Sequence, residues 1–437
     1  MGAAFFEDLI PLYPLYALLF ADPSIPGAGL SGAQVSALFA LWSLSTVIVE
    51  VPSGVIADRF SRRRLVVVGP CITSAGFALW TLVPSFASFA AGFVLWAIGG
   101  SLRSGTTQAL VYDELVHLGR SEDYARLAGA MRAASAIGVV AGTALAAPLF
   151  AWGGYPAAGV ASVVSCLMCA LASSTLPETD GSGVGDPSTE PVLSEKALSD
   201  PAPSDPALTD AGHSEAGLSV LGIVRSGVRD LRTQPAAWGL LLLVVALTWV
   251  AALDEYLPLL VESFVSNSPG GADDGVSRTD IPRTVAVLMV VVSLGDVVGA
   301  LAAGRFRRPA AIGPVVAAAA LALMAASLWA RPVAVIAVAV AFGAFGWALV
   351  VADAALQDRL GSRSRATVTS LAGVGEEVVA LLAFAGWAAG STRFDPPTLF
   401  ALAAIPYLVV PYLASAGATT VSASRRWRNR MSRNAPM

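Results

Sequence analysis

Residues 50–64, EVPSGVIADRFSRRR, join two apolar segments through an acidic residue, a short apolar run and a cluster of arginines. Residues 296–308, DVVGALAAGRFRR, repeat this order. Asp296 stands nine residues before Arg305, as Glu50 stands nine residues before Arg59. A weaker echo pairs ALVYD, which ends at Asp113, with a similar segment in the second half. The repeat predicts that the chain consists of two similar halves.

Apolar residues dominate the chain outside these loops. Of its 437 residues, 55% are hydrophobic and 13% are charged, whereas soluble proteins carry about 25% charged residues. Most apolar residues lie in stretches of about twenty, the length that a helix needs to cross a bilayer. The composition excludes a disordered chain, a nucleic-acid-binding protein and a cytosolic enzyme. It predicts an all-α membrane protein.

Hydropathy predicts twelve transmembrane helices in two pseudo-symmetric bundles of six. The expected spans are 4–21, 33–54, 65–83, 86–116, 125–150, 155–175, 236–262, 284–304, 309–329, 332–358, 365–390 and 396–416. We expect an N-terminal bundle at 1–176, a linker rich in Pro, Ser and Asp at 177–235, a C-terminal bundle at 236–417 and a basic tail at 418–437. Pro11 and Pro14 should kink the first helix because proline cannot donate a backbone hydrogen bond.

The arginines predict the orientation. Of the 27 lysines and arginines, 22 fall on one side of the predicted membrane, four on the other, and Arg103 lies within a span. Cytoplasmic loops carry the excess of basic residues. We therefore expect a plasma-membrane protein whose two termini, linker and tail are cytoplasmic.

Cofactor and metal sites are not expected. The single lysine, Lys196, lies in SEKALSD, which has no phosphate-binding pattern. His117 and His213 are too few and too far apart for a metal centre. Cys166 and Cys169 are interpreted as packing residues of an apolar segment.

Adjacent carboxylates, Glu376 and Glu377, lie eleven and twelve residues beyond Arg365, about 16–18 Å along a helix and near mid-membrane. An ionisable group at that depth is costly unless it has a role. Neighbouring side chains project about 100° apart, so we expect one of the two to face a cavity. We interpret this pair, followed by Asp296 and Glu50, as candidates for proton coupling. Structural hydrogen bonding, helix packing and gating are the alternatives.

Other charges are candidates for substrate binding or charge pairing. Arg103 needs a carboxylate partner or an anionic substrate. Asp113 and Glu114 are placed at the cytoplasmic end of the fourth span, and Asp254 and Glu255 at the outer end of the seventh, where solvated interface charges are the favoured interpretation. Aromatic residues that could line a cavity or form interfacial belts are Tyr13, Tyr16, Trp42, Tyr256 and Trp387.

The loop at residues 54–64, GVIADRFSRRR, is similar to the cytoplasmic signature of the major facilitator superfamily, G-x-L-A-D-R-x-G-R-[KR]. It departs from that signature at Ile56 and Ser61. The segments YPLYALLF, EVPSG and SGTTQALVYDEL resemble an actinobacterial-type branch with no assigned substrate. Together with the twelve spans, the resemblance covers nearly the whole chain. It implies a two-bundle fold that moves a solute by alternating access.

The resemblance also implies a cytoplasmic latch formed by Gly54, Asp58, Arg59, Arg62 and Arg63. The glycine would allow close helix approach, and Asp58 would accept hydrogen bonds from the start of the eleventh span, near 364–367. A role in topology alone is the alternative for the arginines.

An antiporter motif of that family, G-x8-G-x3-G-P-x2-G-G, is partly present on the fifth span. Gly129, Gly138 and Gly142 keep its spacing, but Thr143 replaces the proline and alanines replace the last glycines. Small residues at such spacing also allow tight helix packing without antiport. The motif favours efflux.

These features predict a secondary active transporter that exports a drug or metabolite by proton-coupled antiport. The alternatives are a proton-coupled importer of a small metabolite, including an anionic one, and a receptor or scaffold that does not transport. The expected partners are a small-molecule substrate, protons and the lipid bilayer, with no nucleic acid, and the protein is expected to be a monomer. No enzymatic activity is expected, because the sequence shows no nucleophile–base pair.

Overall fold

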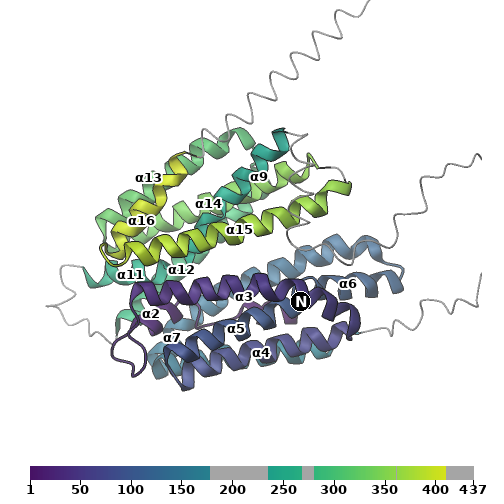
Figure 1. The fold of residues 1–437 in the computed structure, drawn as a ribbon, viewed down its shortest axis with the longest axis horizontal. Coiled ribbons are helices and arrows are strands. Elements are labelled where there is room, and N and C mark those ends of the chain that lie inside the picture. The colour runs from purple at the N-terminus through teal and green to yellow at the C-terminus, as the bar shows by residue number, and fades with distance from the viewer. Residues whose placement is uncertain (178–234, 268–279, 361, 410–437) are drawn as a thin grey trace, which may run out of the picture.

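The structure, a computed structural model, describes residues 1–177, 235–267, 280–360 and 362–409. It does not describe the side chains of residues 51–59, 235–236, 362–367 and 370. The predicted linker and basic tail lie outside the described residues, apart from Pro177 and Pro235. Figure 1 shows two groups of helices stacked on one another, α1 to α7 in one and α9 to α16 in the other.

The first predicted span is divided into two helices, α1 (Gly2–Asp8) and α2 (Tyr16–Ala21). Pro11 and Pro14 lie between them, so the predicted kink is a complete break. The freed backbone N–H of Leu12 donates a hydrogen bond to the hydroxyl of Ser162 at 3.0 Å.

The rest of the first half follows the predicted spans with one further break. Its helices are α3 (Gly32–Arg59), α4 (Arg62–Leu82), α5 (Phe86–Arg103), α6 (Thr106–His117), the 3-10 turn η1 (Ser121–Asp123) and α7 (Tyr124–Ser174). The predicted span 86–116 is split because Gly105, with a φ of +71°, separates α5 from α6. Two predicted spans form α7, which bends at Gly153 and Gly154.

The second half contains α9 (Pro235–Leu247), α10 (Trp249–Asp254), α11 (Leu257–Ser266), α12 (Ile281–Arg305), η4 (Pro309–Ala311), α13 (Ile312–Trp329), η5 (Pro332–Ala334), α14 (Val335–Gln357), α15 (Ser362–Gly390), α16 (Pro396–Ala404) and η6 (Ile405–Leu408). The predicted single helix at 236–262 is wrong, because this path is broken twice, at Thr248 and again at Glu255–Tyr256. Pro258, in the first turn of α11, cannot donate a hydrogen bond back to α10.

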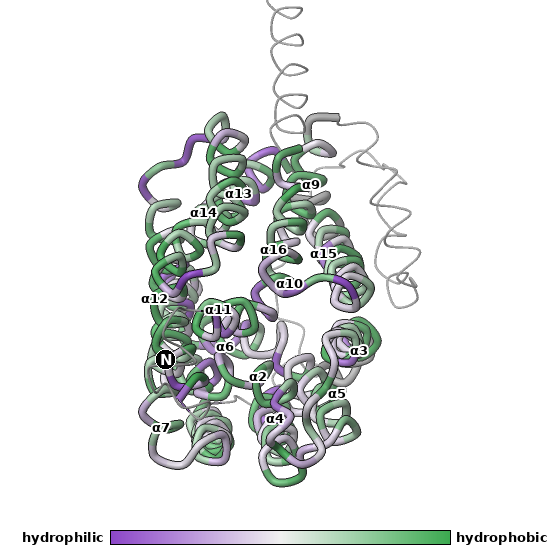
Figure 2. Tube along the Cα trace, turned by 90° about the vertical axis from the view of Figure 1, so that its left-hand side faces the viewer, coloured by the Kyte–Doolittle hydropathy of each residue, from purple (hydrophilic) through white to green (hydrophobic). Residues whose placement is uncertain are grey.

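Nine helical stretches among the described residues are long and apolar enough to cross a membrane. One of them, 121–174, holds two predicted spans joined at the bend in α7. The broken first span and the segment of α16 and η6 (Pro396–Leu408) supply the other two. The helices are apolar along most of their length (Figure 2). The fold is an all-α membrane fold of two six-helix bundles, as predicted.

Arginines mark one end of both bundles. We call the end at which α3 ends (Arg59), α4 begins (Arg62) and α12 ends (Arg305) the basic end, and the opposite one the far end. In Figure 1 the basic end lies on the right, where α6 is labelled.

At the far end the two halves are in direct contact. The hydroxyl of Tyr256, between α10 and α11, donates a hydrogen bond to Ser36 of α3 at 2.7 Å. The Tyr256 ring stacks on Trp387 of α15 with centroids 4.0 Å apart, and it meets Phe39 of α3 edge-on at 5.2 Å. A Cβ placed on Gly32 would lie only 2.7 Å from the Cβ of Ser391. Tyr256 is fully buried, so these contacts seal the halves together at the far end.

Candidate functional site

A cavity of about 210 Å³ lies between the two halves. We call it the central cavity. It lies between the turn after α1, α2, α3, α5 and α7 of the first half and α10, α11 and α12 of the second. The residues that line it are Tyr13, Pro14, Tyr16, Trp42, Trp96, Val139, Thr143, Asp254, Glu255, Pro258, Met289, Val292, Ser293 and Asp296.

Three carboxylates from the second half line the central cavity. Asp254 and Glu255 stand at the break between α10 and α11, and Asp296 lies on α12. The predicted position of Asp254 and Glu255 at the outer end of the seventh span is wrong, because the chain continues through α11 to Ser266 before it leaves the bundle. Asp254 is close enough to Asp296 for the two charges to repel each other.

The first half gives the same cavity an aromatic wall. Trp96 of α5 stacks on Tyr13 with ring centroids 5.5 Å apart and on Trp42 with centroids 5.0 Å apart. Tyr13, Tyr16 and Trp42 thus line a cavity, which is one of the two predicted roles. The other two aromatic candidates, Tyr256 and Trp387, form the far-end contact instead.

A larger cavity of about 720 Å³ lies nearer the basic end. We call it the basic-end cavity. It is lined by Val47, Glu50, Val244, Leu349, Val350, Asp353, Leu356, Gln357, Thr369, Ala372, Gly373, Val374, Glu376 and Glu377. Glu376 and Glu377 both line it, so the expectation that only one would face a cavity is wrong. The cavity is wide enough to receive two side chains that project about 100° apart.

Glu377 also connects the two halves. Its carboxylate accepts a hydrogen bond from the hydroxyl of Ser43 on α3. Glu50, seven residues after Ser43 on α3, interacts electrostatically with Glu377. The matched positions Glu50 and Asp296 therefore have different surroundings, because one lines the basic-end cavity and the other lines the central cavity.

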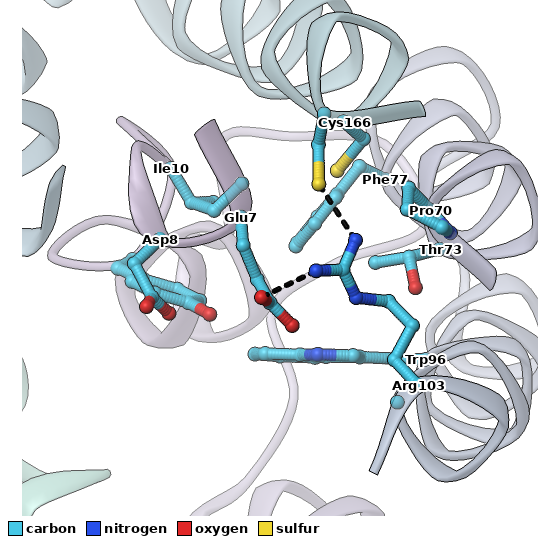
Figure 3. Close-up of a pocket in the computed structure, with 12 residues that line it drawn as sticks. Glu7, Asp8, Ile10, Pro70, Thr73, Phe77, Trp96, Arg103 and Cys166 are labelled. Atoms are coloured by element: carbon cyan, nitrogen blue, oxygen red, sulfur yellow. Dashed lines mark hydrogen bonds and ion pairs between the residues drawn. The ribbon is translucent and has the colours of Figure 1, made fainter. Parts of the chain in front are cut away.

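Arg103 finds its partner inside the first half. It forms an ion pair with Glu7 of α1 at 2.6 Å and donates a hydrogen bond to the sulfur of Cys169 at 2.7 Å. Figure 3 shows the guanidinium between Glu7 and the cysteines, above the ring of Trp96. Only 6% of the Arg103 side chain is exposed. The arrangement satisfies the requirement that a buried cation be paired.

Glu7 and the neighbouring Asp8 are not among the site residues predicted from the sequence. Asp8 accepts a hydrogen bond from Ser135 of α7. Glu7 and Asp8 line a cavity of about 110 Å³ with Arg103. Both acids lie within the first predicted span. The rule that an ionisable residue within a span has a role, which selected Glu376, therefore selects them too.

The remaining charged candidates lie at the basic end. Arg62 forms an ion pair with Asp113, and Arg63 donates a hydrogen bond to the backbone carbonyl of Ser174. Both contacts stay within the first half, joining α4 to α6 and α7. Glu114 also takes part in an interaction.

The side chains of the other latch residues, Gly54, Asp58 and Arg59, lie outside the described residues. The predicted partner segment at 364–367 lies outside them too. The latch stays a prediction.

Two glycines of the partial antiporter motif are sites of close packing. A Cβ on Gly138 would lie 2.4 Å from the carbonyl oxygen of Phe5, and one on Gly142 would lie 2.8 Å from the nitrogen of Ile10. These glycines let α7 approach the broken first span. A Cβ on Gly129 would have no atom within 4 Å, so Gly129 does not take part in this close packing.

A profile of the family described as Major Facilitator Superfamily matches residues 9–382. The chain belongs to this family. It is therefore a multi-pass membrane transporter and not an enzyme. Two cavities lined by carboxylates lie between the halves of this major facilitator superfamily transporter.

Solved structures show the same fold at low sequence identity. The nucleoside transporter NupG has a TM-score of 0.66 at 12% identity, over 95% of this chain and 97% of that one. A bacterial homolog of the human lysosomal transporter Spinster, inward-facing and unoccupied, has a TM-score of 0.62 at 16% identity, over 96% and 93%. An auto-inhibited POT family peptide transporter has a TM-score of 0.62 at 13% identity, over 96% and 95%. The comparison with curated proteins gives no match.

Proposed function

We propose that this transporter exports a drug-like compound or metabolite in exchange for protons. The observation that carries the proposal is the hydrogen bond from Ser43 of the first half to Glu377 of the second. It places a group that can gain or lose a proton directly in the contact between two bodies that rock against each other.

The chemistry of this contact supports coupling. An ionised carboxylate is the stronger acceptor for the Ser43 hydroxyl, and a proton on Glu377 weakens that hydrogen bond. The proton also removes the repulsion between Glu377 and Glu50 of the opposite half. A proton that binds or leaves therefore changes the relative free energies of the two orientations of the halves, which is the requirement for coupling.

Two further observations favour export of an amphiphile. Gly138 and Gly142 of the partial antiporter motif hold α7 against the first span, and aromatic rings form one wall of the central cavity. Anion uptake would need a free basic residue, but Arg103 is already paired with Glu7. Import of an anionic metabolite is thus less supported.

The excess of arginines supports a cytoplasmic basic end, because basic loops stay on the cytoplasmic side. We accordingly place the transporter in the plasma membrane with both termini in the cytoplasm. We also propose that it works as a monomer whose partners are a small-molecule substrate, protons and the lipid bilayer.

Proton movement in energised inside-out vesicles tests the proposal. A pH-sensitive dye would follow the gradient while organic cations, neutral amphiphiles and organic anions are added in turn. We expect one class to dissipate the gradient with the wild-type protein and with Glu122→Gln, which removes an exposed carboxylate at the basic end. Glu377→Gln should abolish the response.

Gradient loss that persists in Glu377→Gln would contradict the coupling role of this residue. Proton movement that accompanies compound entry into right-side-out vesicles, with no response in inside-out ones, would instead support import.

A further inference from the structure

We infer that the central cavity binds a small organic cation with an aromatic or similarly apolar body. The inference deepens the proposed function and rests on it. Its basis is the difference between the two walls of the cavity, one carboxylate-rich and one aromatic.

The wall from the second half carries Asp254, Glu255 and Asp296. None of the three has a hydrogen bond or ion pair within the part of the chain that the structure describes. Among the described residues that line this cavity there is no lysine, arginine or histidine. Uncompensated carboxylates inside a membrane protein are costly, and a bound cation would offset that cost.

Arg103 does not neutralise this group of acids. It lines the neighbouring cavity, where Glu7 and Cys169 accept its hydrogen bonds. Tyr13 and Trp96 line both cavities and stand between them. The first half therefore keeps its cation, so Arg103 does not supply the counter-charge of the central cavity, and a cationic ligand would supply it.

The wall from the first half selects the shape of that cation. Trp96 stacks between Tyr13 and Trp42, with centroid distances of 5.5 and 5.0 Å. Ring faces attract ammonium groups and pack well against flat apolar bodies. Carboxylates on one side and indole rings on the other match a ligand with a charged head and an aromatic or similarly apolar body.

A bare metal ion does not fit the same cavity. Ca²⁺ and Mg²⁺ need several oxygen ligands converging on one point. Among the described residues, no group of three His, Cys, Asp or Glu side chains is close enough to hold an ion. The separated carboxylates suit a larger, diffuse charge.

Calorimetric titration of the full-length, detergent-solubilised protein tests the inference with three matched probes. Phenyltrimethylammonium carries a positive charge, dimethylaniline at a pH where it is neutral differs by one methyl group and the charge, and benzenesulfonate carries a negative charge. We expect the cation to bind at least about tenfold more tightly than either of the other two.

Variants assign the binding to the cavity. Asp296→Asn should weaken cation binding about tenfold, whereas Asp296→Glu, which keeps the charge, should retain it. Glu122→Gln serves as the matched surface control and should bind as the wild type does. A thermal unfolding curve for each variant separates lost binding from lost fold.

Equal affinity for dimethylaniline, unchanged binding in folded Asp296→Asn, or no cation binding up to millimolar concentration would each overturn the inference. The titration needs no proton gradient, so its outcome does not depend on proton flux through Glu377. Failure of Glu377→Gln to alter proton flux would count against the proposed coupling alone.

Discussion

The two halves of the transporter share an architecture but treat their buried charges differently. In the first half Arg103 is paired with Glu7, so the charges cancel within one bundle. In the second half Asp254 and Asp296 face the central cavity without a cation among the described residues. The buried cation of the first half is thus neutralised within its own bundle, whereas the acids of the central cavity have no such partner among the described residues. Proton or solute binding should act mainly on the second half.

The same asymmetry separates positions that the repeat makes equivalent. Glu50 and Asp296 lie at matching places in sequence, yet they line different cavities. The far end is sealed by Tyr256 and Trp387, while the wider basic-end cavity lies between the halves at the other end. The repeat in sequence therefore does not give Glu50 and Asp296 the same environment.

The largest effect is expected from breaking the pair inside the first half. Arg103→Met leaves Glu7 without its partner and should lower the free energy of unfolding by about 3 kcal/mol, the lower end for a broken buried pair because part of Glu7 reaches the cavity. The double variant Glu7→Gln/Arg103→Met should recover most of this loss. Thermal or denaturant unfolding in detergent measures both. A double variant that is less stable than Arg103→Met would contradict the assignment of the pair.

An intermediate effect is expected at the contact between the halves. Ser43→Ala removes the hydroxyl that donates to Glu377, which should weaken the α3–α15 contact by about 1.5 kcal/mol, as for a hydrogen bond to a charged group. The population with a separated far end should rise about tenfold.

Spin labels at Ser31 and Thr392, introduced through cysteines in a cysteine-free background, would report this change as a longer distance. Ser45→Ala, which removes a buried hydroxyl two residues away on α3, is the matched control. Identical distance distributions in Ser43→Ala and the control would remove Ser43 from the coupling scheme.

The smallest effect is expected from the exposed pair of the first half. The Arg62 and Asp113 side chains are 34% and 51% exposed, and such pairs contribute about 0–1 kcal/mol. Asp113→Asn should therefore change unfolding by less than about 1 kcal/mol, and high salt should reduce even that difference. A loss as large as that of Arg103→Met would show that burial does not distinguish the two pairs.

The fold could be predicted largely from sequence, since apolar stretches of membrane-spanning length and the repeat at Glu50 and Asp296 are local signals. Pro11 and Pro14 predicted a kink in the first helix, which the structure shows as a break. Pro258 is a similar signal for the break between α10 and α11. A break at this point predicts that Asp254 lies within the bundle and not at the membrane surface.

The sites were less predictable because they depend on which helices meet. Depth along the helix located Glu376 and Glu377, but no local pattern shows that Ser43 on α3 lies against Glu377. Arg103 was recognised as needing a partner, yet Glu7 is 96 residues away in sequence. Long-range pairs of this kind follow from packing between helices, which a single sequence does not display.

The stacked rings of Tyr256 and Trp387 close one route between the halves, because Tyr256 is fully buried. In the proposed orientation, with the basic end in the cytoplasm, an inhibitor of this state would first have to permeate the membrane and then approach through the basic-end cavity. Screening in intact cells would therefore select compounds for permeability as much as for affinity, whereas screening in inside-out vesicles would rank them by affinity.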